Sequence, residues 1–213
     1  MVGGLLLREG YPTTYQGYRL HTDYTNMLKV DMAFSDKKLP PYLQTVAVLR
    51  LLYAETPPDL HVALDGFYWF YSRGKYKSRE EWDEAHKNEG KHRPAMDFVQ
   101  DGSYILAGFS QTFGIELDKT PYMHWWKFCG LLEALPENTL FQRIIYWRKA
   151  DTAKMSKDER EYVLKMRKIY GLKYDNPDKG KTIQQIEAEL LAENERRFAE
   201  VKAATEAARQ KGG

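Results

Sequence analysis

Few residues in this sequence stand at a spacing that suits nucleophilic catalysis. Cys129 is the single cysteine of the chain, and His124 lies five residues before it. On a helix these two side chains would point about 140° apart, at about 100° per residue, so the imidazole would not reach the thiol. Cys129 also lies in an aromatic, apolar stretch, which favours a buried and unreactive thiol. No G-x-S-x-G motif suggests a serine hydrolase.

The sequence also contains no motif for binding a metal ion or a nucleotide. No two of the five histidines stand four residues apart, as a helical zinc pair requires. His86 and His92 lie near acidic residues, but this arrangement is common on solvated surfaces and forms no ligand cluster. Gly-rich phosphate loops are absent. We therefore predict no catalytic residues, no metal site and no cofactor, and we expect that the protein is not an enzyme. The histidines are His21, His61, His86, His92 and His124.

Two aromatic runs are the most distinctive feature of the sequence. One contains five consecutive aromatic residues, and the other contains two adjacent tryptophans. Aromatic side chains dominate protein cores, so packing alone would explain both runs. Trp and Tyr also anchor interfaces, so a groove for a partner helix would explain them equally well. The sequence leaves both interpretations open, and the candidate partner-binding residues are Phe67, Tyr68, Trp69, Phe70, Tyr71, Trp125 and Trp126.

The composition is that of a globular protein. The chain has 213 residues, of which 43% are hydrophobic and 14% aromatic, so a disordered chain is excluded. With 32 basic and 30 acidic residues the formal charge is only +2, and we do not expect nucleic-acid binding. The first residues lack a signal-peptide pattern, and no apolar run approaches 18 residues. We expect a soluble intracellular protein that does not enter a membrane.

Periodicity and turn residues predict a mainly α fold with a small N-terminal β-hairpin. β-branched and aromatic residues flank Gln16-Gly17, which predicts a hairpin over residues 13–20. Ser78 is expected to begin a short helix in an exposed polar stretch, and Ser156 with Glu159 forms a capping box. About six to seven helices should build the domain. The main ones cover about residues 23–34, 41–54, 58–71, 96–113, 122–135, 138–145 and 156–170.

A boundary is predicted near residue 175. The stretch Asp175-Asn176-Pro177-Asp178-Lys179-Gly180 is typical of a linker. Residues 1–174 would then form the helical domain, and residues 175–213 a linker and a polar helical extension over about 182–211. The apolar stripe of this extension is thin, which gives little support for a coiled coil. It would add contacts or drive self-association.

The sequence resembles the bacteriophage Gp15 family, found in phages with long flexible tails and in prophages of Gram-positive bacteria, over about residues 5–174. The family has no assigned catalytic residues. Two stretches carry the resemblance most specifically, and the aromatic run from Phe67 to Tyr71 matches more loosely. The two specific stretches are Asp97-Phe98-Val99-Gln100-Asp101 and His124-Trp125-Trp126-Lys127-Phe128.

The resemblance implies a role in tail assembly. Genes of this family usually lie between those of the major tail protein and the tape measure protein, where long-tailed phages encode tail assembly chaperones. It implies a chaperone that binds the tape measure protein in the host cytoplasm, with the major tail protein as a further candidate partner, and that is absent from the mature virion. The alternative is a structural component of the tail or tail tip that is retained in the virion.

Overall fold

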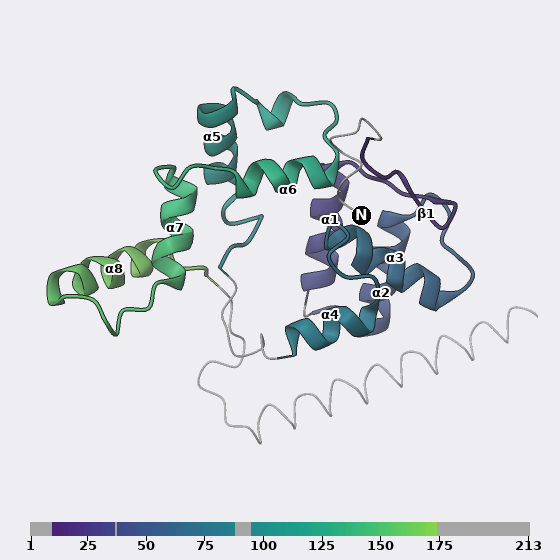
Figure 1. Cartoon of the computed structure of the whole chain (residues 1–213), viewed down its shortest axis with the longest axis horizontal. Helices are drawn as coiled ribbons and strands as arrows, with labels where there is room; N and C mark the ends of the chain where they lie inside the picture. Colours follow the sequence, from purple (N-terminus) through teal and green to yellow (C-terminus); the bar gives the residue numbers. More distant parts are fainter. Residues whose placement is uncertain (1–9, 37, 88–94, 174–213) are drawn as a thin grey trace, which may run out of the picture. The chain divides into compact units, whose positions relative to one another are not determined.

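The computed structural model describes residues 10–36, 38–87 and 95–173. Over these residues the fold is mainly helical with a small N-terminal hairpin, as the sequence predicts (Figure 1). By its internal contacts the chain separates into two compact units, Met1–Leu172 and Lys173–Gly213. All helices and strands named here belong to the first unit. The helix predicted over 182–211 lies outside the described residues. The elements are β1 (Thr14–Tyr15), β2 (Tyr18–Arg19), α1 (Tyr24–Ser35), α2 (Pro41–Leu52), α3 (Leu60–Tyr71), α4 (Arg79–His86), α5 (Gly102–Phe113), the 3-10 helix η3 (Leu117–Lys119), α6 (Trp125–Glu133), α7 (Leu140–Lys149) and α8 (Lys157–Tyr170).

The predicted hairpin is present. Strands β1 and β2 pair antiparallel, with Tyr15 opposite Tyr18. Between them Gln16 and Gly17 have φ values of 46° and 86°, and a type I′ turn requires positive φ at both positions. The chain leaving the hairpin then pairs with the end of α2, where the amide of His21 donates to the carbonyl of Leu52 at 2.7 Å. The hairpin is therefore held against the helices.

Local capping residues start most helices where the sequence predicts. Asp23 accepts from the amide of Thr25 at 3.0 Å at the start of α1, and Pro41 is the first residue of α2. Ser78 caps α4, and Ser156 forms the complete capping box of α8. These side chains satisfy amides that have no partner inside the helix.

Two helices begin later than predicted. Helix α5 begins at Gly102 rather than near Met96, because the Asp97 carboxylate accepts from the amides of Val99 and Gln100 and forms a turn there. Helix α6 begins at Trp125 rather than Tyr122. The residues before it are extended because they pair with the segment before α1: the amide of Tyr24 donates to Met123, and that of Trp125 donates to Thr22, both at 2.8 Å.

Helix α3 lies at the centre of the main core. Its side chains Phe67 and Phe70 are fully buried, together with Phe109 of α5 and Phe128 of α6. A helix that carries aromatic residues on every side needs such surroundings, and of the two interpretations left open by the sequence, core packing accounts for these side chains. Gly66 lets the side chains of Tyr53 and Tyr15 pack directly against the backbone of α3, since a Cβ built there would lie 2.0 Å from the Tyr53 hydroxyl and 2.5 Å from Tyr15.

Helices α7 and α8 form a helical hairpin with a small core of their own (Figure 1). Ile144, Trp147 and Val163 are its buried residues. A buried ion pair joins this hairpin to the start of α5, because the Arg148 guanidinium donates to both carboxylate oxygens of Asp101 at 2.6 and 2.8 Å. Asp101 is 0% exposed, so Arg148 neutralises a charge that water cannot reach.

We predict opposite effects of the same substitution at two helical glycines. Gly66→Ala should lower the free energy of unfolding by about 1–3 kcal/mol, because the new methyl group would overlap Tyr53 and Tyr15. Gly130→Ala in α6 meets nothing within 4 Å and should raise it by about 0.5–1 kcal/mol, because alanine favours helix. Urea denaturation followed by circular dichroism measures both. Equal changes in the two variants would contradict the close packing at Gly66.

We also predict that Arg148→Met lowers the free energy of unfolding by about 3–5 kcal/mol, because it leaves the Asp101 carboxylate buried and unpaired. Arg143→Met, on the exposed side of the same helix, is the control and should cost about 1 kcal/mol or less. Adding Asp101→Asn to Arg148→Met should recover part of the loss. The same urea denaturation applies, and a double variant less stable than Arg148→Met would argue against a charge effect.

Candidate partner-binding surface

The aromatic run of α3 is used mainly for packing. Phe67, Tyr68 and Phe70 are buried, whereas Trp69 and Tyr71 are half-buried. The hydroxyl of Tyr71 donates to the carboxylate of Asp31 in α1. Burial raises the pKa of this tyrosine well above 10, and the nearby Asp31 charge raises it further, so the phenol stays protonated. Four residues of this run are thus committed to the interior of the protein.

The two tryptophans of α6 hold the C-terminal end of α3. The indole N–H of Trp126 donates to the carbonyl of Phe70 at 2.9 Å, and that of Trp125 donates to Tyr71 at 3.3 Å. Carbonyls in the last turn of a helix lack intrahelical partners, so these bonds close the end of α3. Trp125 is buried, and Trp126 is half-buried. The structure therefore brings the two predicted aromatic runs together.

His124 acts as the cap of α6. Its Nδ1 accepts from the amide of Trp126 at 3.1 Å, so its proton is on Nε2, which donates to the carbonyl of Pro12 at 2.9 Å. Burial lowers the pKa of this histidine below 6.5. Both ring nitrogens are engaged, so His124 is not available to activate Cys129. Burial also raises the pKa of the Cys129 thiol to about 12, which suits an unreactive cysteine.

A chain of aromatic rings runs from the hairpin to the start of α6 and reaches the surface. Tyr15 contacts Trp69 at 5.2 Å between ring centroids, and Trp69 contacts Trp126 at 5.4 Å. Trp126 lies 6.2 Å from His124, whose other neighbour Tyr11 stacks on it at 4.7 Å. We call these five residues, together with Tyr122, the aromatic strip. Three segments far apart in sequence contribute to it.

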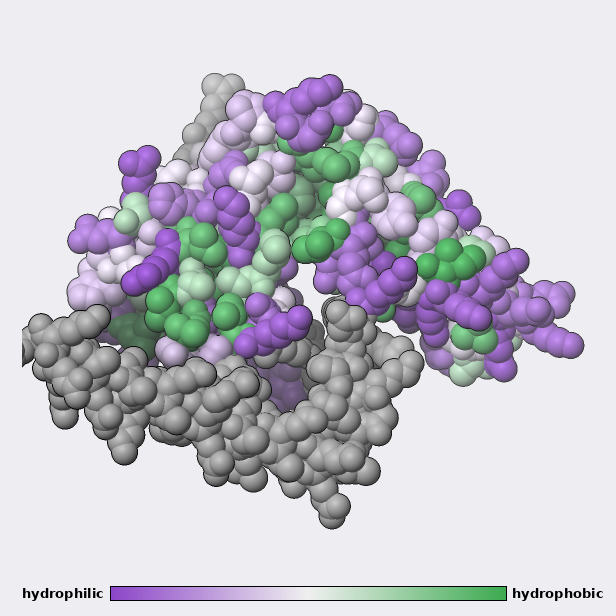
Figure 2. All heavy atoms as spheres, turned by 180° about the vertical axis from the view of Figure 1, so that it is seen from behind, coloured by the Kyte–Doolittle hydropathy of each residue, from purple (hydrophilic) through white to green (hydrophobic). Residues whose placement is uncertain are grey.

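Hydrophobic residues also reach the surface elsewhere. Figure 2 shows them in green among hydrophilic residues on the opposite side from Figure 1. Met32 of α1 is 52% exposed. Leu43 and Val46 are exposed on α2. These side chains are not aromatic, so they lack the ring-to-ring contacts of the aromatic strip.

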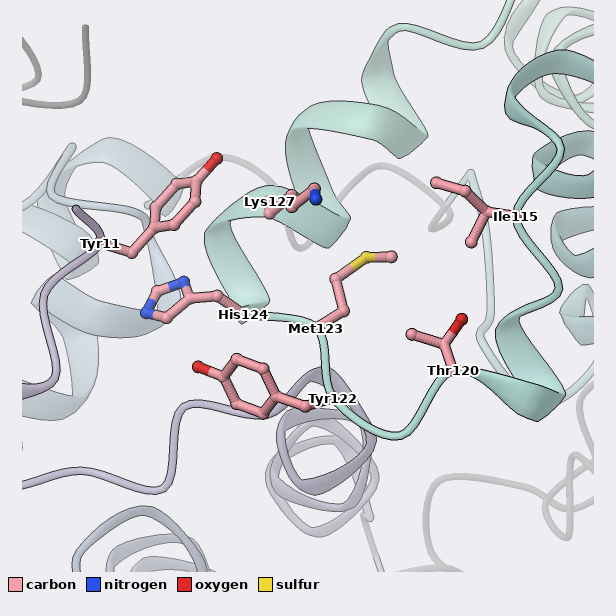
Figure 3. A pocket seen from close by; sticks show the side chains of 7 residues that line it. All are labelled: Tyr11, Ile115, Thr120, Tyr122, Met123, His124 and Lys127. Carbon is pink, nitrogen blue, oxygen red and sulfur yellow. The ribbon is translucent and has the colours of Figure 1, made fainter. Parts of the chain in front are cut away.

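A pocket of about 340 Å³ lies at one end of the aromatic strip (Figure 3). Tyr11 and Tyr122 stand on either side of His124, and Lys127 projects from α6 beside them. Tyr122 is 55% exposed, and its hydroxyl is 2.8 Å from that of Thr22. The lining is aromatic, aliphatic and hydroxyl-bearing with one cation, which suits an apolar protein segment. It is lined by Tyr11, Ile115, Thr120, Tyr122, Met123, His124 and Lys127.

Tyr11, Tyr15 and Tyr122 were not predicted as site residues. They lie in or beside loops, where no periodic pattern marks a functional side chain. Of the residues that were predicted, Trp69 and Trp126 belong to the aromatic strip and retain exposed surface. The partner-binding role of the seven remains a prediction, but of the seven only these two are accessible enough to contribute directly.

One comparison with known proteins gives a match. A family model described as Bacteriophage Gp15 protein matches residues 10–172. No curated protein and no solved structure matches the chain. No helix in the described ranges is both long and apolar enough to cross a membrane.

Because the fold requires neutral His124, we predict a loss of stability in mild acid. The pKa is about 6.5 in the unfolded chain and lower in the folded protein. The stabilisation is therefore complete above pH 6.5 and is lost as the pH falls towards the folded pKa. His124→Asn keeps a capping side chain that accepts at any pH, so it should weaken the dependence between pH 7.5 and 5.5.

The measurement is the urea midpoint at the two pH values. His61→Asn makes the same substitution at an exposed histidine in the first turn of α3 and is the control for the change of side chain. A His124→Asn variant with an unchanged pH dependence would contradict this role for the ring.

Proposed function

Because this chain belongs to the bacteriophage Gp15 protein family, we propose that it is a tail assembly chaperone that binds the tape measure protein. The family itself supports the broader description, a phage structural or assembly protein. Two observations support the chaperone role in particular. Genes of this family usually lie next to the tape measure gene, and the aromatic strip is a surface that suits apolar helices. A chaperone of this kind would act in the host cytoplasm and be absent from the virion.

The two stretches most typical of the family support a role without catalysis. In the first, Asp97 forms a turn and Asp101 accepts from Arg148 in the buried ion pair. In the second, His124 caps α6, and the tryptophan indoles bind the carbonyls at the end of α3. Every polar group in this account has a structural partner. We therefore propose that the protein works by binding other proteins and is not an enzyme.

The observation that carries the proposal is the aromatic strip. Rings that are partly exposed on a rigid core lose little conformational entropy on binding, and Tyr and Trp are the commonest anchors of interfaces. The rings of His124 and Trp126 are held by hydrogen bonds to backbone carbonyls, and neighbouring rings of the strip contact each other. An amphipathic helix could lay its apolar face along it. Covering that face would keep a long helical protein soluble until the tail tube forms.

The proposal predicts that the strip is needed to retain tape-measure fragments. Co-expression of the full chain with fragments of the tape measure protein from the same phage should keep them soluble, and pulldown should survive 1 M salt because the contacts are apolar. Tyr11→Ser and Tyr122→Ser should each reduce retention about 30-fold, because a hot-spot ring contributes about 2 kcal/mol.

The control is Tyr146→Ser in α7, because Tyr146 and Tyr122 are both 55% exposed. Its retention of fragments should be unchanged. Loss of binding in this control as well as in the strip variants, or binding that vanishes in modest salt, would refute the strip as the interface. Detection of stoichiometric protein in purified virions would overturn the chaperone role and favour a structural tail component.

A further inference from the structure

A second surface of the molecule differs in chemistry from the aromatic strip. A groove of about 750 Å³ runs along α7 and reaches α8. Tyr146 and Tyr162 are 55% and 47% exposed at this groove, and Trp147 is 4% exposed beneath them. Glu137 is the single acidic residue in its lining, and the basic ones are Arg143 and Lys149.

The aromatic part of the groove is ordered by contacts with neighbouring side chains. The Arg143 guanidinium lies 5.1 Å from the Trp147 ring centroid and donates to the Tyr162 hydroxyl at 3.5 Å. Trp147 also stacks on Tyr170 at 5.3 Å between ring centroids, with the ring planes 23° apart. The groove is therefore preformed, with a cation fixed directly above its aromatic base.

The hairpin that carries the groove is basic, unlike the chain as a whole. Residues 137–173 hold ten basic and five acidic side chains, a formal charge of +5, whereas the whole chain has +2. Arg148 and Arg167 are used internally, since they bind Asp101 and the carbonyl of Trp147. Lys149 and Lys165 are exposed and form no ion pair with any described residue. Of these two lysines, Lys149 lines the groove, and it is available to a partner as far as the described residues are concerned.

We propose that the α7–α8 groove binds an acidic amphipathic helix of a partner protein. An aliphatic side chain of that helix would fit between Tyr146 and Tyr162, and its carboxylates would pair with Arg143 and Lys149. Cations that are exposed and unpaired attract an oppositely charged partner and set its orientation. The site is independent of the tape-measure interface, since it uses other helices and predicts the opposite dependence on salt.

The groove fits a protein helix better than a nucleic acid. Single-stranded nucleic acids bind by stacking bases on open aromatic faces. Trp147 is buried, with Arg143 and Tyr170 against its ring, so no base can stack on it. The first turns of α8 also carry Asp158, Glu159 and Glu161, which would repel a phosphate backbone. These acids do not line the groove, so a helix seated in it along one face can direct its carboxylates to Arg143 and Lys149.

The test uses the full chain and a fluorescently labelled helical peptide that carries leucine on one face and glutamate on both flanks. Fluorescence anisotropy should show saturable binding at 50 mM salt that weakens at least tenfold at 300 mM. The same peptide with lysine in place of glutamate should not bind. Arg143→Glu with Lys149→Glu, and separately Tyr146→Ser, should each weaken binding about tenfold or more, with unchanged circular dichroism.

Lys38→Glu and Tyr122→Ser are the matched controls, an exposed lysine and an equally exposed tyrosine outside the hairpin, and both should leave the affinity unchanged. Binding that falls equally with Lys38→Glu would overturn the groove as the site. Binding of a labelled 20-nucleotide single strand more tightly than the acidic peptide would overturn the choice of a helix. Failure of the acidic peptide to bind at either salt concentration would overturn the proposal altogether.

Discussion

The buried pair of Asp101 and Arg148 is the constraint on which the arrangement of the later helices depends. A carboxylate with no exposure to water is stable only when it is neutralised and hydrogen-bonded. Arg148 does this from α7 while it also donates to the carbonyls of Ala95 and Tyr170. One guanidinium thus joins the segment before α5, the helix α7 and the end of α8. Because it faces inward, the opposite face of α7 is left for Arg143 and Tyr146.

Most residues of the two aromatic runs pack in the core, and few remain on the surface. Most rings of the α3 run are enclosed, and the α6 indoles donate to backbone carbonyls at the end of α3. What reaches the surface is the edge of this packed cluster, continued by Tyr11 and Tyr122 from neighbouring segments. The aromatic strip is therefore rigid because the core beneath it is rigid. Binding at such a surface does not first require the protein to order itself.

The features predicted from sequence are those that depend on near neighbours. Gln16-Gly17 determines its own turn, and the capping box of Ser156 needs only Glu159, three residues away. The late start of α6 depends on pairing with Thr22, about 100 residues away, and no local pattern carries that information. The same holds for the aromatic strip, since Tyr11 meets His124 only after folding. Periodicity therefore indicated the aromatic core but not the edge of it that we propose as a partner-binding surface.

The indole bonds from α6 to α3 make the identity of two side chains matter as well as their size. Phenylalanine at position 125 or 126 would occupy similar space but donate no hydrogen, and a helix end would lose a partner. Tryptophan is the only aromatic residue with an N–H in its ring system that has no competing acceptor role. The two indole protons can therefore be followed by proton NMR. Slow exchange of these protons with solvent would show that α3 and α6 stay hydrogen-bonded to each other while a partner is bound to the aromatic strip.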